Sequence, residues 1–446
     1  MSVDTTTPRR ASNEPLAESS SPFSSLAIQP YRVLWIAGLF SFLSVQGQLV
    51  LRGILAWDLT ERDSALGVVY LCFGVSLLIA TPLGGVAADR YTKRTILVAC
   101  QVALFIVALT MGLLVVTDTI KFWMLPFASA AQGIAFGFFA PGRMAFTAEL
   151  VGRGHLGNAI SLGVLSMNST RIVAPFAAGL LAGYATVGIG GTYLISAAIS
   201  AIALVFLLRT PAIAPAATDA DGNPRPLRGN PLVEIADSLR YVKAEPKLRR
   251  LVVVSFFVIM FGFNYVAFLP SLVMDTFGQN ETFVGLAMMA AAIGAVATAI
   301  PTAKLADGPR AQGLMDVAGF LFGAAVLALA FAPNFVAAFG VLMVVGGATA
   351  MFQSLSNTLA LTRATDAVQG RVQSLLMLSF AGFGIAAGPL GVLAELLGRR
   401  QAIAVMGVVV LISMAIYRVF ELRGARKGET ASTVTAVAPE PVSAAR

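Results

Sequence analysis

Four ionisable residues interrupt stretches of sequence that are otherwise apolar: Arg52, Arg143, Glu149 and Arg171. A charged side chain inside a membrane span costs roughly 2.5–3.5 kcal/mol on insertion scales, so where one occurs it usually has a function. Arg143 and Glu149 are six residues apart and point to different faces of a helix, so each is expected to pair with another helix. Glu149 lies close to the end of its span and could be an inner-gate residue or a proton carrier.

Two of these arginines have polar neighbours in the sequence. Gln48 and Arg52 are spaced i,i+4 and share a helix face, which is expected to look into a cavity. The alternative for Arg52 is snorkelling to the outer membrane interface. Arg171 follows Asn168 in the middle of its span, which makes it the best candidate for a charge in a central cavity. The alternative for Arg171 is a structural pair with Glu149.

The second half of the chain adds neutral polar residues inside apolar stretches. They are Asn264, Tyr265, Gln353, Ser354, Ser356 and Asn357, and Phe261 and Phe263 flank the first two. The expected cavity is mostly apolar with aromatic walls, which suits amphiphilic organic molecules. An importer of sugars or amino acids would show more hydrogen-bonding residues per span.

Motifs for other chemistry are missing from the sequence. It contains no G-x-x-x-x-G-K-[ST] string for ATP, no H-E-x-x-H metal motif and no Gly-x-Ser-x-Gly elbow. Cys72 and Cys100 lack metal-ligand spacing, and the single histidine, His155, lies in a short turn. We therefore predict no catalysis, no metal and no cofactor.

The elements that position these residues follow from composition. Of 446 residues, 57% are hydrophobic and 12% charged, about half the charge of an average soluble domain. A membrane-spanning helix needs about 20 apolar residues. The sequence predicts an all-α membrane protein with twelve transmembrane helices, at 31–56, 65–88, 95–117, 122–149, 157–184, 190–208, 250–274, 282–303, 314–332, 335–362, 371–397 and 402–419.

The formal charge of +8 reflects membrane orientation rather than nucleic-acid binding. Segments on the side of the two termini hold 24 of the 31 Lys and Arg residues, whereas the opposite loops hold Arg62, Lys121, Arg399 and Arg400. By the positive-inside rule, both termini are cytoplasmic. The first residues lack the apolar core of a signal peptide.

Composition also divides the chain into segments. We predict a disordered cytoplasmic tail (1–30), a six-helix bundle (31–208), a cytoplasmic linker (209–249), a second six-helix bundle (250–419) and a C-terminal cytoplasmic tail (420–446). The linker begins with a Pro- and Ala-rich run and ends in a basic amphipathic helix, in which Leu232, Ile235, Leu239 and Val242 recur at helical spacing.

The two predicted bundles resemble each other. GGVAADRYTKR (84–94) follows the second span and TAKLADGPR (302–310) follows the eighth, so Asp89 and Asp307 occupy corresponding positions. Such repeats are typical of carriers whose halves rock around a central site. Helix-packing residues correspond as well, in the fifth and eleventh spans: Pro175 with Gly388 and Pro389.

The loop after the second span resembles the signature of the major facilitator superfamily. It reads Gly85-Val-Ala-Ala-Asp89-Arg90-Tyr-Thr92-Lys93-Arg94, and Thr92 stands where that family usually has Gly. The resemblance implies that Asp89 contacts the N-terminus of the eleventh helix near Gly370 and latches the cytoplasmic side in the outward-open state, where the helix dipole favours a carboxylate. The cations Arg90, Lys93 and Arg94 would pair with acids or lipid phosphates, or serve topology alone.

A closer resemblance covers most of the chain. YRVLW (31–35), APGRMAFTAELV (140–151) and GNAI (157–160) are similar to a branch containing exporters of the enterobactin-exporter and macrolide-efflux type. Arg143 and Glu149 match a pair that recurs in that branch. Two positions depart from patterns of the wider superfamily. Ala174 replaces the Gly of a Gly-Pro motif that is associated with the outward-releasing direction. Ser129 stands where many proton antiporters have Arg, three residues before Gln132-Gly133, which concerns proton coupling.

The resemblance implies a secondary transporter in the bacterial plasma membrane, working as a monomer in the lipid bilayer. It would export amphiphilic small molecules, such as drugs or siderophore-like metabolites, by proton-coupled alternating access. The alternatives are an importer or facilitator of a small organic solute on the same scaffold, and a non-transport membrane role.

Overall fold

The computed structural model describes residues 23–213, 240, 243, 245–305, 308, 310–363 and 369–435, and these residues form helices and no strand. The first group of helices is α1 (Gln29–Thr60), α2 (Asp63–Arg90), α3 (Lys93–Val116), α4 (Met124–Ala182) and α5 (Gly188–Leu208), preceded by the short η1 (Ser24–Ala27). The second group is α7 (Pro246–Phe257), η2 (Val258–Gly262), α8 (Tyr265–Ser271), η3 (Leu272–Thr276), α9 (Glu281–Leu305), α10 (Ala311–Ala330), α11 (Phe335–Arg363), α12 (Gln369–Leu397) and α13 (Arg399–Thr435).

These helices confirm the predicted fold class. Among the described residues, eleven helical segments are long and apolar enough to cross a membrane, and α12 adds the shorter apolar stretch Gly382–Leu397. The largest difference from the predicted spans is α13, which continues to Thr435 instead of ending at 419. Residues 1–22, most of the linker with its predicted amphipathic helix, Asp307 and residues 436–446 lie outside the described residues.

Two of the helical runs depart from a simple span. The long α4 contains two spans, Met124–Gly152 and His155–Ala182, which meet at Gly152 with φ 66° and ψ 179°. Glycine adopts a positive φ at no steric cost, so the chain reverses direction there. The span Pro246–Thr276 is built from α7, η2, α8 and η3, and its two π segments interrupt the α-helical pattern.

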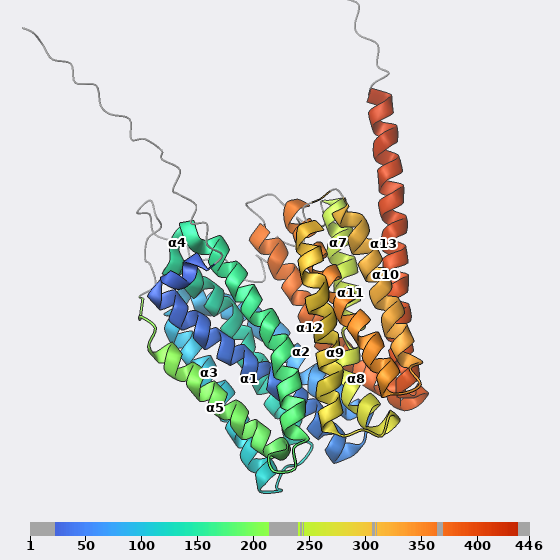
Figure 1. Ribbon diagram of the computed structural model, residues 1–446. Coiled ribbons are helices and arrows are strands. Elements are labelled where there is room, and N and C mark those ends of the chain that lie inside the picture. The colour runs from blue at the N-terminus through green and yellow to red at the C-terminus, as the bar shows by residue number, and fades with distance from the viewer. Residues whose placement is uncertain are drawn as a thin grey trace, which may run out of the picture.

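The helices form two groups that lie side by side (Figure 1). We call the N-terminal half the spans of α1 to α5 and the C-terminal half the spans of α7 to α13. The termini end is the end where α1 and α7 begin and α5 finishes. The far end carries the opposite turns, around residues 61–62, 117–123, 183–187, 277–280, 331–334 and 398. The ribbons of the two halves approach each other at the far end and diverge toward the termini end (Figure 1).

Two glycine seams join the halves toward the far end. Where α2 crosses α12, a Cβ added to Gly67 would lie 2.5 Å from the carbonyl oxygen of Ala387, and one added to Gly384 would lie 2.5 Å from the carbonyl oxygen of Tyr70. Gly388, predicted as a packing residue, adds to this seam, because its Cβ would lie 2.9 Å from Leu71. Small residues let helix backbones approach closely.

The second seam pairs the last span of α4 with α9. A Cβ on Gly179 would lie 2.5 Å from the backbone of Gly285, and one on Gly183 would lie 2.0 Å from the Thr282 hydroxyl. Each seam joins the second span of one half to the fifth span of the other, so the two seams are related by the repeat seen in the sequence. Pro175 is buried near this seam, and α4 continues through it.

Candidate functional site

One polar contact in the middle of the spans joins the two halves. Nη1 of Arg171, on the last span of α4, donates a hydrogen bond to Oε1 of Gln353 on α11 at 3.5 Å. The same guanidinium lies over the ring of Phe263, 5.9 Å from its centroid. Arg171 therefore lies between the halves: its backbone belongs to α4 of the N-terminal half, and its side chain contacts Gln353 and Phe263 of the C-terminal half. Glu149, the alternative partner expected from the sequence, pairs with Lys93.

Aromatic rings extend from this contact. The ring of Phe263 lies 6.0 Å from that of Phe383 in an edge-to-face arrangement, and Phe383 lies 5.5 Å from Tyr70 of the N-terminal half, also edge to face. The ring of Tyr265 lies 6.2 Å from that of Phe263. These spacings are typical of favourable aromatic contacts. We call Arg171, Gln353, Phe263, Phe383 and Tyr70 the interface cluster.

The remaining polar residues predicted in the C-terminal half have different positions. Asn264 is fully buried, and its Nδ2 donates to the carbonyl oxygens of Met260 and, at 3.0 Å, Phe383. Asn264 thus ties the residues next to the π segment to the backbone of α12 at Phe383. Asn357 is half-buried one turn from Gln353 on the same face of α11.

Arg52 and Gln48 are buried inside the N-terminal half. Arg52 is fully buried, so its side chain does not snorkel to an interface. Its guanidinium donates to Oγ of Ser129 at 3.0 Å and to Oε1 of Gln132. The amide of Gln48 donates to Oγ of Ser44 at 2.9 Å.

The environment of Arg52 bears on the missing arginine at position 129. Ser129 and Gln132 lie on α4, whereas Arg52 comes from α1. A guanidinium therefore does lie beside Gln132-Gly133 in this chain, supplied by a different helix from the one that the antiporter pattern uses.

Arg143 also occupies a site within one half. Its guanidinium lies 4.8 Å from the ring centroid of Phe42. It fits between two glycines, because a Cβ on Gly38 would lie 3.0 Å from Nη1 and one on Gly163 would lie 3.1 Å from Nη2. The absence of side chains at both positions makes room for the guanidinium. The carboxylate of Glu149, six residues along the helix, binds Lys93 instead of Arg143.

The signature loop lies at the termini end. Nζ of Lys93 pairs with Oε1 of Glu149 at 2.6 Å, and the lysine side chain is only 6% exposed. Nη2 of Arg94 donates to the carbonyl oxygen of Leu208 at 2.6 Å, and Arg90 is exposed. The backbone of Asp89 is in the last turn of α2, and its side chain lies outside the described part.

The two glycines before Asp89 have different environments. A Cβ on Gly84 would lie 2.6 Å from the carbonyl oxygen of Gly137, so this glycine allows α2 and α4 to cross closely. A Cβ on Gly85 would meet nothing within 4 Å. Of these two glycines, only Gly84 takes part in the close approach of α2 and α4 in this conformation.

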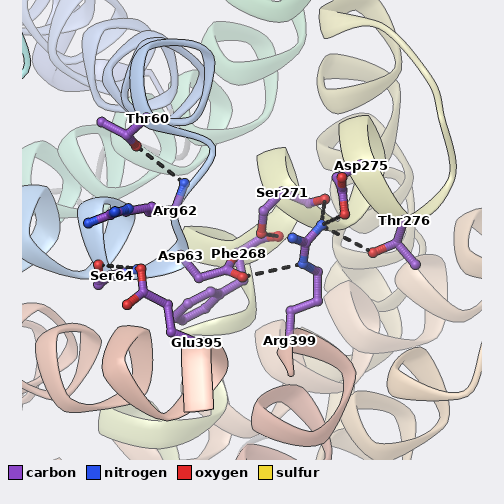
Figure 2. A network of polar contacts seen from close by, with 10 residues as sticks. All are labelled: Thr60, Arg62, Asp63, Ser64, Phe268, Ser271, Asp275, Thr276, Glu395 and Arg399. Carbon is purple, nitrogen blue, oxygen red and sulfur yellow. Dashed lines mark hydrogen bonds and ion pairs between the residues drawn. The ribbon is translucent and has the colours of Figure 1, made fainter. Parts of the chain in front are cut away.

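A cluster that the sequence did not single out joins the halves at the far end (Figure 2). Arg399, the first residue of α13, pairs through Nε with Oδ2 of Asp63 at 3.3 Å and through Nη1 with Asp275. Nη1 also donates to the carbonyl oxygen of Ser271 at 2.8 Å. The guanidinium lies 4.6 Å from the ring of Trp57. We call Arg399 with Asp63, Asp275 and Trp57 the far-end lock.

A second polar contact supports the lock. Oγ of Ser64 donates to Oε1 of Glu395 at 2.5 Å, which ties the start of α2 to the end of α12. From the sequence, Arg399 is placed in a loop and Asp63 is not singled out, because the two residues are 336 positions apart and nothing local links them. The signal that could have shown it is the repeat itself, which brings the second and eleventh spans together.

Within the described residues, no three His, Cys, Asp or Glu side chains are grouped so that they could hold a metal ion. The polar groups of the interface cluster are one guanidinium, one amide and one phenol. This arrangement can bind a ligand by hydrogen bonds and ring contacts.

Comparisons with known proteins agree with this architecture. The sequence profile of the Major Facilitator Superfamily matches residues 34–389. The Staphyloferrin A transporter of Staphylococcus aureus is 25% identical over 384 residues, which cover 84% of this chain and 94% of the relative. The Enterobactin exporter EntS of Shigella boydii is 26% identical over 353 residues, or 77% of this chain and 80% of the relative.

Solved structures share the fold. A bacterial homologue of the human lysosomal transporter Spinster, in an inward-facing and unoccupied conformation, superposes with a TM-score of 0.69 at 16% identity, covering 90% of this chain and 97% of that one. The nucleoside transporter NupG gives a TM-score of 0.68 at 15% identity, covering 88% of this chain and 98% of that one. The fold and relatives are those of membrane transporters, not of enzymes. Because the family profile matches most of the chain, this multi-pass membrane protein belongs to the Major Facilitator Superfamily.

Proposed function

We propose that the protein is a secondary transporter that exports amphiphilic small molecules, siderophore-like metabolites or drugs among them, by proton-coupled alternating access. One observation carries the proposal: Arg171 of one half contacts Gln353 and Phe263 of the other, midway along the spans. A ligand bound there touches both halves. Rocking of the halves would then expose it to one side of the membrane at a time.

The orientation of the protein in the membrane follows from the charge of its loops. The segments that the sequence places on the side of the termini contain 24 Lys and Arg residues, against four in the opposite loops, so we assign the termini end to the cytoplasm. With the glycine seams and the far-end lock closed, the structure then corresponds to a state open to the cytoplasm. Each chain contains both halves, so a monomer is sufficient for this cycle.

The opposite state requires closure of the termini end. We propose that Asp89 then contacts the N-terminus of α12, where partial positive charge stabilises a carboxylate. Gly85, Arg90, Lys93 and Arg94 would support this latch, and Asp307 would be its counterpart in the C-terminal half. The open space next to Gly85 in the present conformation leaves room for such an approach.

The proposal is tested in an efflux-deficient bacterial host that expresses the full chain. Cells receive a fluorescent amphiphilic cation or a fluorescent amphiphilic carboxylate, with and without a protonophore. We expect lower accumulation of at least one probe, and loss of that difference with the protonophore. Unchanged accumulation of both probes would contradict broad efflux, and higher accumulation would indicate import.

Asp89→Asn is expected to abolish export while the protein still reaches the membrane. Asp118→Asn is the matched control, because Asp118 is exposed in a far-end turn with φ 53°, a conformation that Asn tolerates. Normal export by Asp89→Asn would rule out the latch.

A further inference from the structure

We propose that the interface cluster binds an organic anion: a carboxylate or other deprotonated oxygen attached to an aromatic or apolar body. The inference rests on the proposed function, in that it takes the interface between the halves as the place where the transported molecule binds. It adds the charge and the body of that molecule.

The distribution of charge along the spans is the first support. Arg52, Arg143 and Arg171 each lie more than two helical turns from the nearer end of their span. Every Asp and Glu within the described spans lies within two turns of a span end. The middle of the described spans is therefore cationic, and a cation bound there would be repelled in a medium of low dielectric constant.

Arg171 differs from the other two arginines in its position. Arg52 is held inside the N-terminal half by Ser129 and Gln132, and Arg143 lies over Phe42 of the same half. Arg171 alone among the three contacts both halves. An anion on Arg171 would consequently sense the relative position of the halves.

Arg171 and Gln353 offer hydrogen-bond donors to which a ligand with acceptor oxygens could bind. Nε2 of Gln353 is buried and has no hydrogen-bond partner among the described residues, and a buried donor without a partner costs about 1–3 kcal/mol. The bond from Arg171 to Oε1 of the same amide is long, at 3.5 Å. A carboxylate could accept from the guanidinium, whose planar fork suits two parallel bonds, and from the amide Nε2 as well.

The rings of the cluster define the rest of the ligand. Phe263 lies next to Arg171, and Phe383 and Tyr70 continue from it across the boundary between the halves. These residues place an apolar and aromatic surface beside the cationic group. A small hydrophilic anion would leave this surface unused, whereas an aromatic acid would contact both parts.

The test uses the purified full chain in lipid nanodiscs and three probes that share one ring system: 1-naphthoate, neutral 1-naphthamide and cationic 1-naphthylmethylammonium. Binding is measured by equilibrium dialysis. We expect naphthoate to bind about tenfold more tightly than naphthamide, since hydrogen bonds to charged groups exceed neutral ones by about that factor, and the ammonium to bind most weakly. Equal binding of acid and amide, or a preference for the ammonium, would overturn the proposal.

Variants test whether the preference for naphthoate over naphthamide arises at the interface cluster. Arg171→Gln should bind acid and amide equally, Arg171→Lys should keep part of the preference, and Gln353→Leu should weaken naphthoate a few-fold. The control is Arg209→Gln, because Arg209 also lies 5.9 Å from a phenylalanine ring, that of Phe206, but is exposed at the termini end. A full preference retained in Arg171→Gln would overturn the assignment.

The outcome is separable from that of the proposed function. Binding does not require movement, so a chain that prefers naphthoate through Arg171 but exports neither fluorescent probe would leave this inference standing and count against export. Export of the amphiphilic cation with no preference for naphthoate would support export and contradict this inference. If Arg171→Gln fails to fold, the ranking of the three probes on the native chain decides.

Discussion

The two ends of the molecule use their polar side chains differently. At the far end, Arg399 and Asp63 pair across the two halves. At the termini end, each ion pair between described residues lies within one half, as in Lys93 with Glu149 at 2.6 Å and Arg418 with Asp316 at 2.6 Å. The termini-end pairs can persist while the halves move, whereas the far-end contacts must break.

Glycines also differ in whether they lie between the two halves or face open space. Gly384 sits in the seam between α12 and α2, where its Cα face meets backbone of the other half. Gly340 on α11 faces open space. A side chain added at the first position obstructs one conformation of the whole molecule, and one added at the second obstructs nothing.

The largest expected effect therefore comes from Gly384→Leu. Its Cβ would lie 2.5 Å from the carbonyl oxygen of Tyr70, so the far end cannot close. We expect export to fall to background. Spin labels at the exposed far-end residues Tyr184 and Val336, in a chain whose Cys72 and Cys100 are replaced by Ser, should move apart.

Gly340→Leu is the control and should leave both export and label distances as in the parent. Unchanged label distances in Gly384→Leu would mean that the seam is not the contact that closes the far end.

The contrast between the two ends also shows what the sequence can and cannot predict. Hydropathy is a local property, so it placed the spans well: 65–88 was predicted where α2 is Asp63–Arg90. Arg171 and Gln353 could both be singled out because each is a polar residue in an apolar stretch. Their contact could not be predicted, because it depends on the angle between the halves.

Other details depend on which neighbour a helix face meets. Helical spacing places Gln48 and Arg52 on one face, but packing directs Arg52 to Ser129 on α4 and Gln48 to Ser44 on its own helix. Adjacent residues on a helix point about 100° apart, so the signature alone cannot tell that Gly84, not Gly85, makes the close approach. The far-end lock joins residues that each look ordinary in isolation.

A smaller effect, on stability alone, is expected at the termini end. Lys93→Met leaves the carboxylate of Glu149 without its partner, and both side chains are largely buried, 6% and 20% exposed. Breaking a buried pair from one side is strongly destabilising, so we expect a loss of about 2–3 kcal/mol of unfolding free energy, recovered in large part by Lys93→Met with Glu149→Met.

Thermal unfolding of the purified chain measures this change. Labels at Tyr91 and Leu422, exposed residues of the two halves at the termini end, should report the same distance in the parent and the double variant. A shifted distance would show that the Lys93–Glu149 pair differs between conformations, and the contrast between the two ends would then fail.

The smallest and most discriminating effect is expected from two neighbouring arginines. Arg399→Gln removes the charge that pairs with Asp63 across the two halves and with Asp275 within the C-terminal half. Of these two contacts, only the one with Asp63 forms when the far end closes. The Arg399 and Asp63 side chains are largely buried, 16% and 6% exposed, but glutamine can still donate a neutral hydrogen bond to Asp63. We therefore expect a shift of about 1–2 kcal/mol toward the far-end-open state, a five- to thirtyfold change in the ratio of states. Arg400→Gln should leave that ratio unchanged, because Arg400 donates to the carbonyl oxygen of Ala330 at 3.1 Å and lies over Phe277, both in its own half.

Distance distributions between labels at Tyr184 and Val336 measure the ratio of the two states directly. Equal shifts in the two variants would mean that positive charge at the far end matters only in total, whereas a shift in Arg399→Gln alone ties closure to the contact that crosses between the halves.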